Sequence, residues 1–139
     1  MADITVTAAK VGLVYPEKAE VFDFIAAASI TAGQTLYIDS NGKVNIADAN
    51  GSGTLQFRGI ALNAAGAGQA VSVLKKGHAF GFTVTSQSYD AALFLSNTAG
   101  SLADAAGATS INCGRVVSLP DSSLTKVVYI EADWLRTWS

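Results

Sequence analysis

Apolar and polar residues alternate along much of the chain with the period of a β-strand. The clearest case is residues 32–38, which read Ala-Gly-Gln-Thr-Leu-Tyr-Ile, and residues 67–73 repeat the pattern as Ala-Gly-Gln-Ala-Val-Ser-Val. In each copy the glycine suits a turn, because glycine adopts a positive φ without a steric penalty, and the residues after it alternate as in a pleated strand. Between the copies, Asn41 and Gly42 stand between alternating flanks, which is typical of a β-hairpin. The chain is therefore predicted to be built from hairpins.

Further strands are predicted along the rest of the chain. The runs with strand-like alternation or apolar character are residues 21–25, 55–62, 80–84, 93–95, 111–119 and 127–130. Gly59 lies inside one of these runs, which indicates a β-bulge or the close approach of another backbone segment. About eight to nine short strands, spaced by about 8–12 residues, are typical of a β-sandwich or a β-barrel. We expect a compact all-β fold of one of these two kinds.

Both ends of the chain leave two interpretations open. Residues 1–20 begin with strand-like alternation and continue into a polar stretch, so they form either a first strand or an extended N-terminal arm that lies on a partner. Residues 131–139 contain two tryptophans beside a leucine. These side chains either fold back onto the core or anchor a neighbouring subunit, because tryptophan is enriched in interface hot spots. The candidate partner-contact residues are Tyr15, Trp134, Leu135 and Trp138.

The composition favours one domain with an unusually neutral surface. The chain has 139 residues, the usual size of a single domain, so residues 1–139 are predicted to form one β domain. Hydrophobic residues make up 50% of the chain and charged residues only 14%, against about 25% in an average soluble domain. Such a surface is easier to understand if part of it is buried against another chain. The composition therefore favours an oligomer or a component of an assembly.

Charge, apolar runs and cysteine content exclude several classes of protein. The net charge of −2 argues against a nucleic-acid-binding protein, which needs a clustered basic face. No apolar run approaches the ~18–20 residues that cross a bilayer, so we expect no membrane association. The first residues lack the basic region of a signal peptide, and none is expected. The single cysteine, Cys113, excludes an internal disulfide and is expected to be a small buried residue.

No motif indicates catalysis. His78, the one histidine, stands beside two lysines at an expected strand boundary, so it is predicted to be a surface residue rather than a general base. No serine lies in a Gly-x-Ser-x-Gly elbow, and no Gly-x-x-x-x-Gly-Lys loop is present to bind phosphate. The acidic residues are scattered without the dense spacing of a metal site. We therefore expect a protein that is not an enzyme and that has no cofactor and no metal site.

Several segments resemble a known family. They are residues 30–39, 41–44, 57–62, 64–73, 93–102 and 114–117, and together they are similar to the capsid cement, or head decoration, proteins of tailed bacteriophages. The resemblance extends over roughly residues 28–119 and consists of turn-and-strand patterns rather than chemical motifs. Members of this family are often labelled as RecA-like recombinases. The absence of an ATP-binding loop in this sequence contradicts such a label.

The resemblance implies a structural virion protein on the outer surface of the mature phage head. Proteins of this kind commonly sit as homotrimers over three-fold and quasi-three-fold positions, where they bridge neighbouring major capsid protein subunits. The implied partners are the major capsid protein and further copies of the chain, without nucleic acid or membrane.

Two alternatives remain open. One is a virion-surface binding module, such as a head-fibre base or a carbohydrate-binding β-sandwich, with Tyr37, Tyr89 and Trp134 as candidate aromatic contacts. The other is a small β-barrel enzyme or carrier domain, which would need a reactive lysine, cysteine or histidine in a defined pocket.

Overall fold

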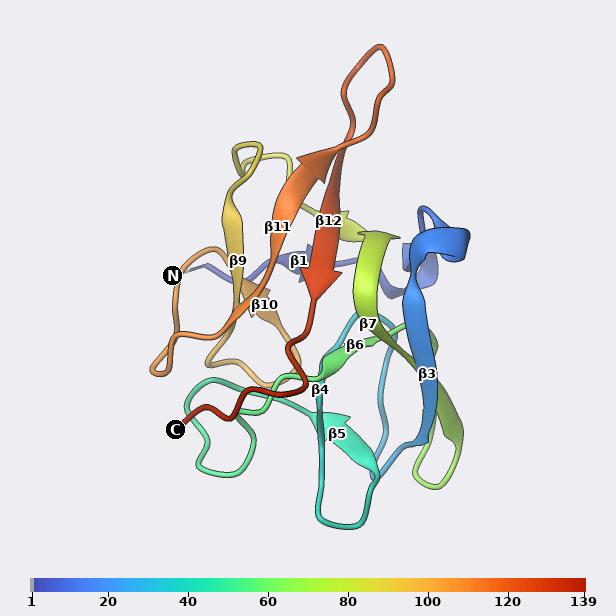
Figure 1. Cartoon of the computed structure of the whole chain (residues 1–139), viewed down its shortest axis with the longest axis vertical. Coiled ribbons are helices and arrows are strands. Elements are labelled where there is room, and N and C mark those ends of the chain that lie inside the picture. Colours follow the sequence, from blue (N-terminus) through green and yellow to red (C-terminus); the bar gives the residue numbers. More distant parts are fainter. Residues whose placement is uncertain (1) are drawn as a thin grey trace.

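The computed structural model describes residues 2–139, and this part of the chain is all-β (Figure 1). It contains twelve strands, four of which are only two residues long. The strands are β1 (Thr5–Val6), β2 (Gly12–Leu13), β3 (Glu20–Ile25), β4 (Thr35–Ile38), β5 (Val44–Ile46), β6 (Gly59–Ala61), β7 (Ala70–Phe80), β8 (Phe82–Thr83), β9 (Ala92–Leu95), β10 (Leu102–Ala103), β11 (Asn112–Ser118) and β12 (Lys126–Glu131). The only helical segments among the described residues are two 3-10 turns, η1 (Ala8–Lys10) and η2 (Pro16–Lys18).

The all-β prediction is confirmed, although the number of strands exceeds the eight to nine expected. The additional strands are the two-residue ones, which are too short to produce a recognisable alternation in the sequence. Ten strands form one antiparallel sheet that curls into a half-barrel, while β1 and β8 form a separate pair. Of the two architectures left open by the sequence, the fold therefore follows the barrel-like one.

Strand β7 is the centre of the sheet. The strand order is β10-β9-β11-β12-β7-β6-β4-β5, and both β2 and β3 also pair with β7. The first half of β7 lies between β3 and β6, whereas its second half lies between β2 and β12. Because its two halves have different neighbours, this eleven-residue strand joins both parts of the curled sheet.

The core is divided into two clusters. The larger cluster contains Phe57, Ile60, Leu74, Leu93, Leu95, Leu102, Ile111, Val116, Val128 and Ile130, among others. The smaller one contains Ala26, Ile30, Leu36, Val44, Ala61, Ala65, Val71 and Val73. Strand β7 supplies residues to both clusters. Cys113 is fully buried in the larger cluster, as the sequence predicted.

The repeated Ala-Gly-Gln sequence forms the same turn twice. Gly33 and Gly68 have φ values of 92° and 83°, which require glycine in practice. In the first copy, the Gln34 N–H donates to the Thr31 carbonyl at 3.3 Å, and Gln34 Oε1 accepts from the Thr31 N–H at 2.9 Å. Residues 66–69 form the same two bonds at 3.0 and 2.7 Å. In both copies the glutamine side chain closes the turn, which explains why a glutamine follows the glycine each time.

Two further local predictions are confirmed. The hairpin at Asn41-Gly42 connects β4 with β5, and Gly42 has a φ of 78°. Gly59 has a φ of 152°, and a Cβ placed there would lie 2.5 Å from the Leu74 carbonyl oxygen. Of the two interpretations of Gly59, the structure therefore shows the close approach of another backbone segment.

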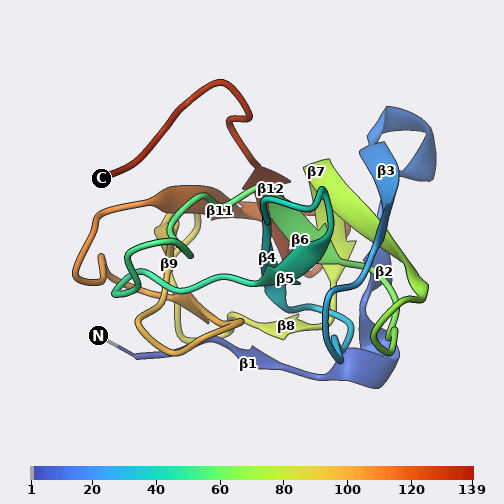
Figure 2. The same cartoon turned by 90° about the horizontal axis from the view of Figure 1, so that it is seen from below.

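The two ends of the described chain lie against its body. Ile4 is buried, and its N–H donates to the Leu102 carbonyl at 2.8 Å, while β1 pairs with β8. Figure 2 shows β1 and the C-terminal segment on opposite sides of the molecule. The N-terminal segment is thus paired with its own chain through short strands, and a contact between this segment and a partner stays a prediction.

Candidate functional site

The segment after β12, residues 132–138, crosses the body of the protein and is called the C-terminal strap. Arg58 holds it through its guanidinium, which donates to the Asp133 carbonyl at 3.1 Å and to the Arg136 carbonyl at 3.0 Å. Gln56 holds its end, because its amide donates to the Trp138 carbonyl at 2.7 Å and accepts from the Trp138 N–H at 2.9 Å. The strap is therefore held mainly by side-chain hydrogen bonds rather than by a strand ladder.

Trp138 folds back onto the larger core cluster. It is only 8% exposed, and the guanidinium groups of Arg58 and Arg136 lie 5.7 and 5.4 Å from the centroid of its ring. Burial lowers the pKa of Arg58, and the Asp133 carboxylate partly offsets this effect. Cations at this distance from an indole ring are attracted to its face. The ring of Trp138 thus contributes to holding the strap.

Trp134 is half-buried and connects the strap with β3. Its indole N–H donates to the Arg58 carbonyl at 2.7 Å, and its ring centroid lies 5.0 Å from that of Phe22 and 6.2 Å from that of Phe24. The Lys75 ammonium lies 5.5 Å from the same ring. Both tryptophans therefore make extensive contacts within the chain.

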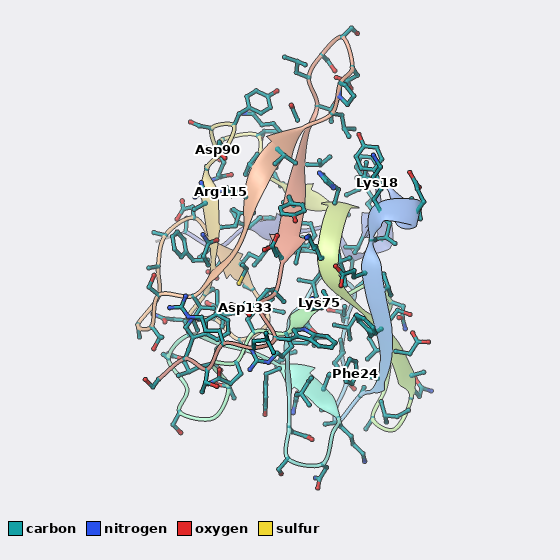
Figure 3. All side chains as sticks on the ribbon, viewed as in Figure 1. Lys18, Phe24, Lys75, Asp90, Arg115 and Asp133 are labelled. Atoms are coloured by element: carbon teal, nitrogen blue, oxygen red, sulfur yellow. The ribbon has the colours of Figure 1, made fainter. Side chains whose placement is uncertain are left out.

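Leu135 differs from its two neighbours, because its side chain is 97% exposed. Its N–H donates to Asp133 Oδ1 at 3.1 Å, which supports the turn that directs it outward. Asp133 and Leu135 line an open cleft together with Lys75. Figure 3 labels Asp133 and Lys75. Leu135 is therefore the one large apolar side chain of the strap that is exposed.

Tyr15 lies elsewhere, against His78 on β7. Its ring meets His78 edge-on at 5.1 Å, and His78 lies 5.1 Å from the ring of Tyr129 on β12. The Lys18 ammonium lies 5.6 Å from the centroid of the Tyr15 ring. Burial lowers the pKa of His78, and the charge of Lys18 lowers it further. His78 is half-buried between aromatic rings, so the prediction of an ordinary surface residue missed its packing.

Sequence reasoning also missed the exposure of β3. Val21, Phe22 and Ile25 are 36%, 43% and 42% exposed. Among residues 2–139, this one strand carries three of the seven exposed large hydrophobic residues. An apolar run such as residues 21–25 indicates a strand but not its position in the sheet. Only the pairing of the strands shows that β3 lies at the margin.

No catalytic arrangement emerges from the described residues. A cleft of about 530 Å³ lies between the strap and the sheet and is lined by Phe94, Arg115, Tyr129, Glu131, Arg136 and Trp138, among others. In residues 2–139, no group of three histidine, cysteine or acidic side chains could hold a metal ion. Burial raises the pKa of the Cys113 thiol well above its ordinary value, which keeps it in the unreactive protonated form.

No helix within residues 2–139 has the length and apolar character needed to span a membrane.

The carbohydrate-binding alternative needs exposed aromatic faces around one concave surface. Tyr37 is half-buried and packs against the larger core cluster, and Trp134 is covered by Phe22 on β3. Tyr89 is exposed but belongs to a different cleft, beside the β11–β12 turn. The three aromatic candidates therefore do not form one platform.

Comparison with protein families identifies the class of the protein. Residues 2–77, more than half of the chain, match the phage cement proteins. The chain belongs to the phage cement protein family. This finding confirms the resemblance seen in the sequence and makes the chain a structural phage capsid protein. The match ends within β7, so the C-terminal strap lies outside it. No curated protein matches the chain.

Proposed function

We propose that this cement protein binds the outer surface of the phage head as a homotrimer and bridges neighbouring major capsid protein subunits. The family match over residues 2–77 carries this proposal. The low charge and the exposed apolar side chains on β3 and the strap support it, because such surfaces are usually covered by another protein.

Capsid stabilisation follows from binding alone. A protein that binds the assembled shell but not its separated subunits stabilises the shell by mass action. Contacts repeated over a symmetric surface add to one another, so a trimer that touches several subunits at once holds them with an avidity above that of one contact. No active site is needed for this function.

We infer that Leu135 is a direct partner contact and that Trp134 and Trp138 hold it in place. Leu135 exposes almost all of its side chain, whereas the two tryptophans are engaged by Arg58, Gln56 and β3. Tyr15, which lies against His78 on β7, is proposed as a second contact region. Contacts at two separate places suit a protein that bridges subunits.

The experiment is sedimentation of the purified protein, first alone and then with mature phage heads that lack it. Analytical ultracentrifugation of the free protein gives its oligomeric state. We expect saturable co-sedimentation with heads in multiples of three copies per three-fold site, and a higher melting temperature of the decorated heads. A free monomer that does not sediment with heads would contradict the proposal and favour the glycan-binding alternative, to be tested on a glycan array.

A further inference from the structure

Strand β3 is bonded to the sheet along one edge only. In the β3–β7 register Asp23 lies opposite Ser72. The Ser72 N–H donates to Asn63 Oδ1 at 2.7 Å, and its carbonyl accepts from the Leu62 N–H at 2.8 Å. Both backbone groups of Ser72 therefore point away from β3, so this is a non-hydrogen-bonded pair of the antiparallel ladder. The N–H and C=O of Asp23 point outward in turn.

The outward direction repeats at every second residue. Because hydrogen-bonded and non-hydrogen-bonded pairs alternate, Val21, Asp23 and Ile25 all direct their backbone groups away from β7. The N–H of Ala26 donates to the Gln69 carbonyl at 2.8 Å, which fits this alternation. Within residues 2–139, β3 pairs with β7 and with no other strand. Three N–H groups and three carbonyls are thus available along one edge.

The side chains of β3 protect this edge only at its centre, through the single charge of Asp23. Residues 21–25 contain no lysine or proline, and the one irregularity in pairing lies at the start of the strand, between Glu20 and Val21. Val21 and Ile25 are exposed on one face, and Phe22 on the other. Edge strands that remain free in solution usually carry charges, proline or a bulge against pairing with other chains. An edge strand that is apolar apart from Asp23 indicates an edge that is covered in the functional assembly.

Other margins of the sheet are covered by the chain itself. Beside β10, the Ile4 N–H donates to the Leu102 carbonyl at 2.8 Å. Beside β5, the Ala27 N–H donates to the Val44 carbonyl at 2.8 Å. Strand β3, which runs along the right-hand margin in Figure 1, has no such cover in the described chain.

We propose that an extended segment of the major capsid protein adds to the outer edge of β3 as a further strand, with a basic side chain opposite Asp23. This inference rests on the proposed function and names the surface that carries it. Backbone hydrogen bonds to residues 21, 23 and 25 would supply the contact, and Val21, Phe22 and Ile25 would be covered by side chains of the added strand.

The charge of Asp23 argues against a second copy of the chain as the added strand. When two β3 strands pair about a two-fold axis, the register that uses all three outward residues places Val21 opposite Ile25 and Asp23 opposite Asp23. Like charges directly opposite each other destabilise an antiparallel pair. Asp23 accepts a hydrogen bond from the neutral Ser72 hydroxyl at 3.0 Å, so its charge is available to a cation. A different chain with lysine or arginine at this place fits the edge.

The test uses Asp23→Pro in the full-length protein. Proline removes the outward N–H and obstructs an added strand, yet it leaves the bonds between β3 and β7 in place, because the lost N–H faces away from β7. Asp23→Ala is the matched control, since it removes the carboxylate and keeps the N–H. Binding to heads that lack the cement protein is measured by co-sedimentation over a range of protein concentrations.

We expect Asp23→Pro to weaken head binding about tenfold or more and Asp23→Ala to weaken it at most about threefold. Equal binding by Asp23→Pro and wild type would overturn the proposal. Equal losses in both variants would also overturn it, because the contact would then be ionic. A self-association of the free protein that only Asp23→Pro abolishes would assign the edge to a second copy instead.

Hydrogen exchange keeps the test decisive if Asp23→Pro does not fold. In the wild-type protein, the amides of residues 20–26 should exchange more slowly on heads than in solution, and unchanged exchange there would overturn the proposal. Wild-type protein that does not bind heads at all would refute the proposed function, and the β3 proposal with it. Wild-type binding without protection of residues 20–26 would refute the β3 proposal alone.

Discussion

Single glycines determine the path of the chain at points where the backbone has a positive φ. Gly59 and Gly42 both have positive φ values, 152° and 78°, but their surroundings differ. A Cβ on Gly59 would meet the Leu74 carbonyl oxygen at 2.5 Å, whereas nothing lies within 4 Å of the corresponding position on Gly42. A substitution at Gly42 therefore measures the cost of the backbone conformation alone, whereas one at Gly59 adds the cost of a steric clash.

We predict that Gly59→Ala lowers the free energy of unfolding by about 3 kcal/mol or more, because β6 must move away from β7. Gly42→Ala should cost only about 1 kcal/mol, the conformational penalty of an L-residue at positive φ. Chemical denaturation of both variants measures the difference. Equal losses would show that the approach of the two strands does not constrain this position.

Tyr129 gives a prediction for alkaline pH. Burial raises its pKa from 10.0 to about 12, with further contributions from its hydrogen bond to Glu131 and from the negative charges of Glu131 and Glu20. Because the folded state holds the proton more tightly than the unfolded state, the stabilising contribution is complete below pH 10 and is lost as the pH rises toward 12.

Titration of tyrosinate absorbance should therefore show one of the four tyrosines ionising near pH 12 in the folded protein. In Tyr129→Phe this late step should disappear, and the loss of stability above pH 10 should become smaller. Ionisation of every tyrosine below pH 11 in the folded wild-type protein would contradict the burial of Tyr129.

Among the elements, the C-terminal strap depends most clearly on individual side chains. Arg58 supplies two hydrogen bonds to strap carbonyls and a cation above the Trp138 ring. We predict that Arg58→Ala lowers the free energy of unfolding by about 1–3 kcal/mol and increases proteolysis of the strap. Arg58→Lys should be intermediate, because an ammonium group lacks the planar fork that reaches both carbonyls.

Arg115→Ala is the matched control for this prediction. Arg115 is a half-exposed arginine that also donates to a carbonyl, that of Asp90 at 2.6 Å, and although it lines the cleft beside the strap it forms no hydrogen bond with a strap residue. Limited proteolysis followed by mass spectrometry measures release of the strap in each variant. The same cleavage rate in Arg58→Ala and wild type would show that Gln56 and the tryptophans hold the strap without Arg58.

At the scale of the whole molecule, the proposed function predicts that head binding and folding can be separated. Leu135→Ser should change the free energy of unfolding by less than about 0.5 kcal/mol, because the side chain is 97% exposed. It should nevertheless weaken binding to heads, and avidity should amplify a loss at each copy into a large loss for the trimer. Co-sedimentation and the melting temperature of decorated heads measure the effect.

Leu124→Ser provides the comparison, because Leu124 is 51% exposed on the turn between β11 and β12. If Leu124→Ser abolished binding and Leu135→Ser did not, the turn rather than the strap would be the contact region. Equal binding by both variants and wild type would leave β3 and Tyr15 to carry the interaction.

The sequence by itself determined the features that depend on local conformation. The all-β class follows from alternation with a period of two, and the turns at Gly33, Gly42 and Gly68 follow from the positive φ that glycine permits. The burial of Cys113 and the resemblance to cement proteins were also recognisable, since both rest on short apolar and turn-and-strand patterns. None of these inferences requires knowledge of distant neighbours.

Only the tertiary structure decided which of these elements meet. Trp138 contacts Gln56, which is 82 positions earlier in the sequence, and Arg58 reaches strap carbonyls 75 and 78 positions away. Residues 21–25 were recognisable as a strand, and only the pairing with β7 places them at an edge with exposed apolar side chains. The physical reason is that exposure and side-chain contacts between distant segments depend on strand order in the sheet, whereas alternation in a single strand is the same at the centre and at the edge.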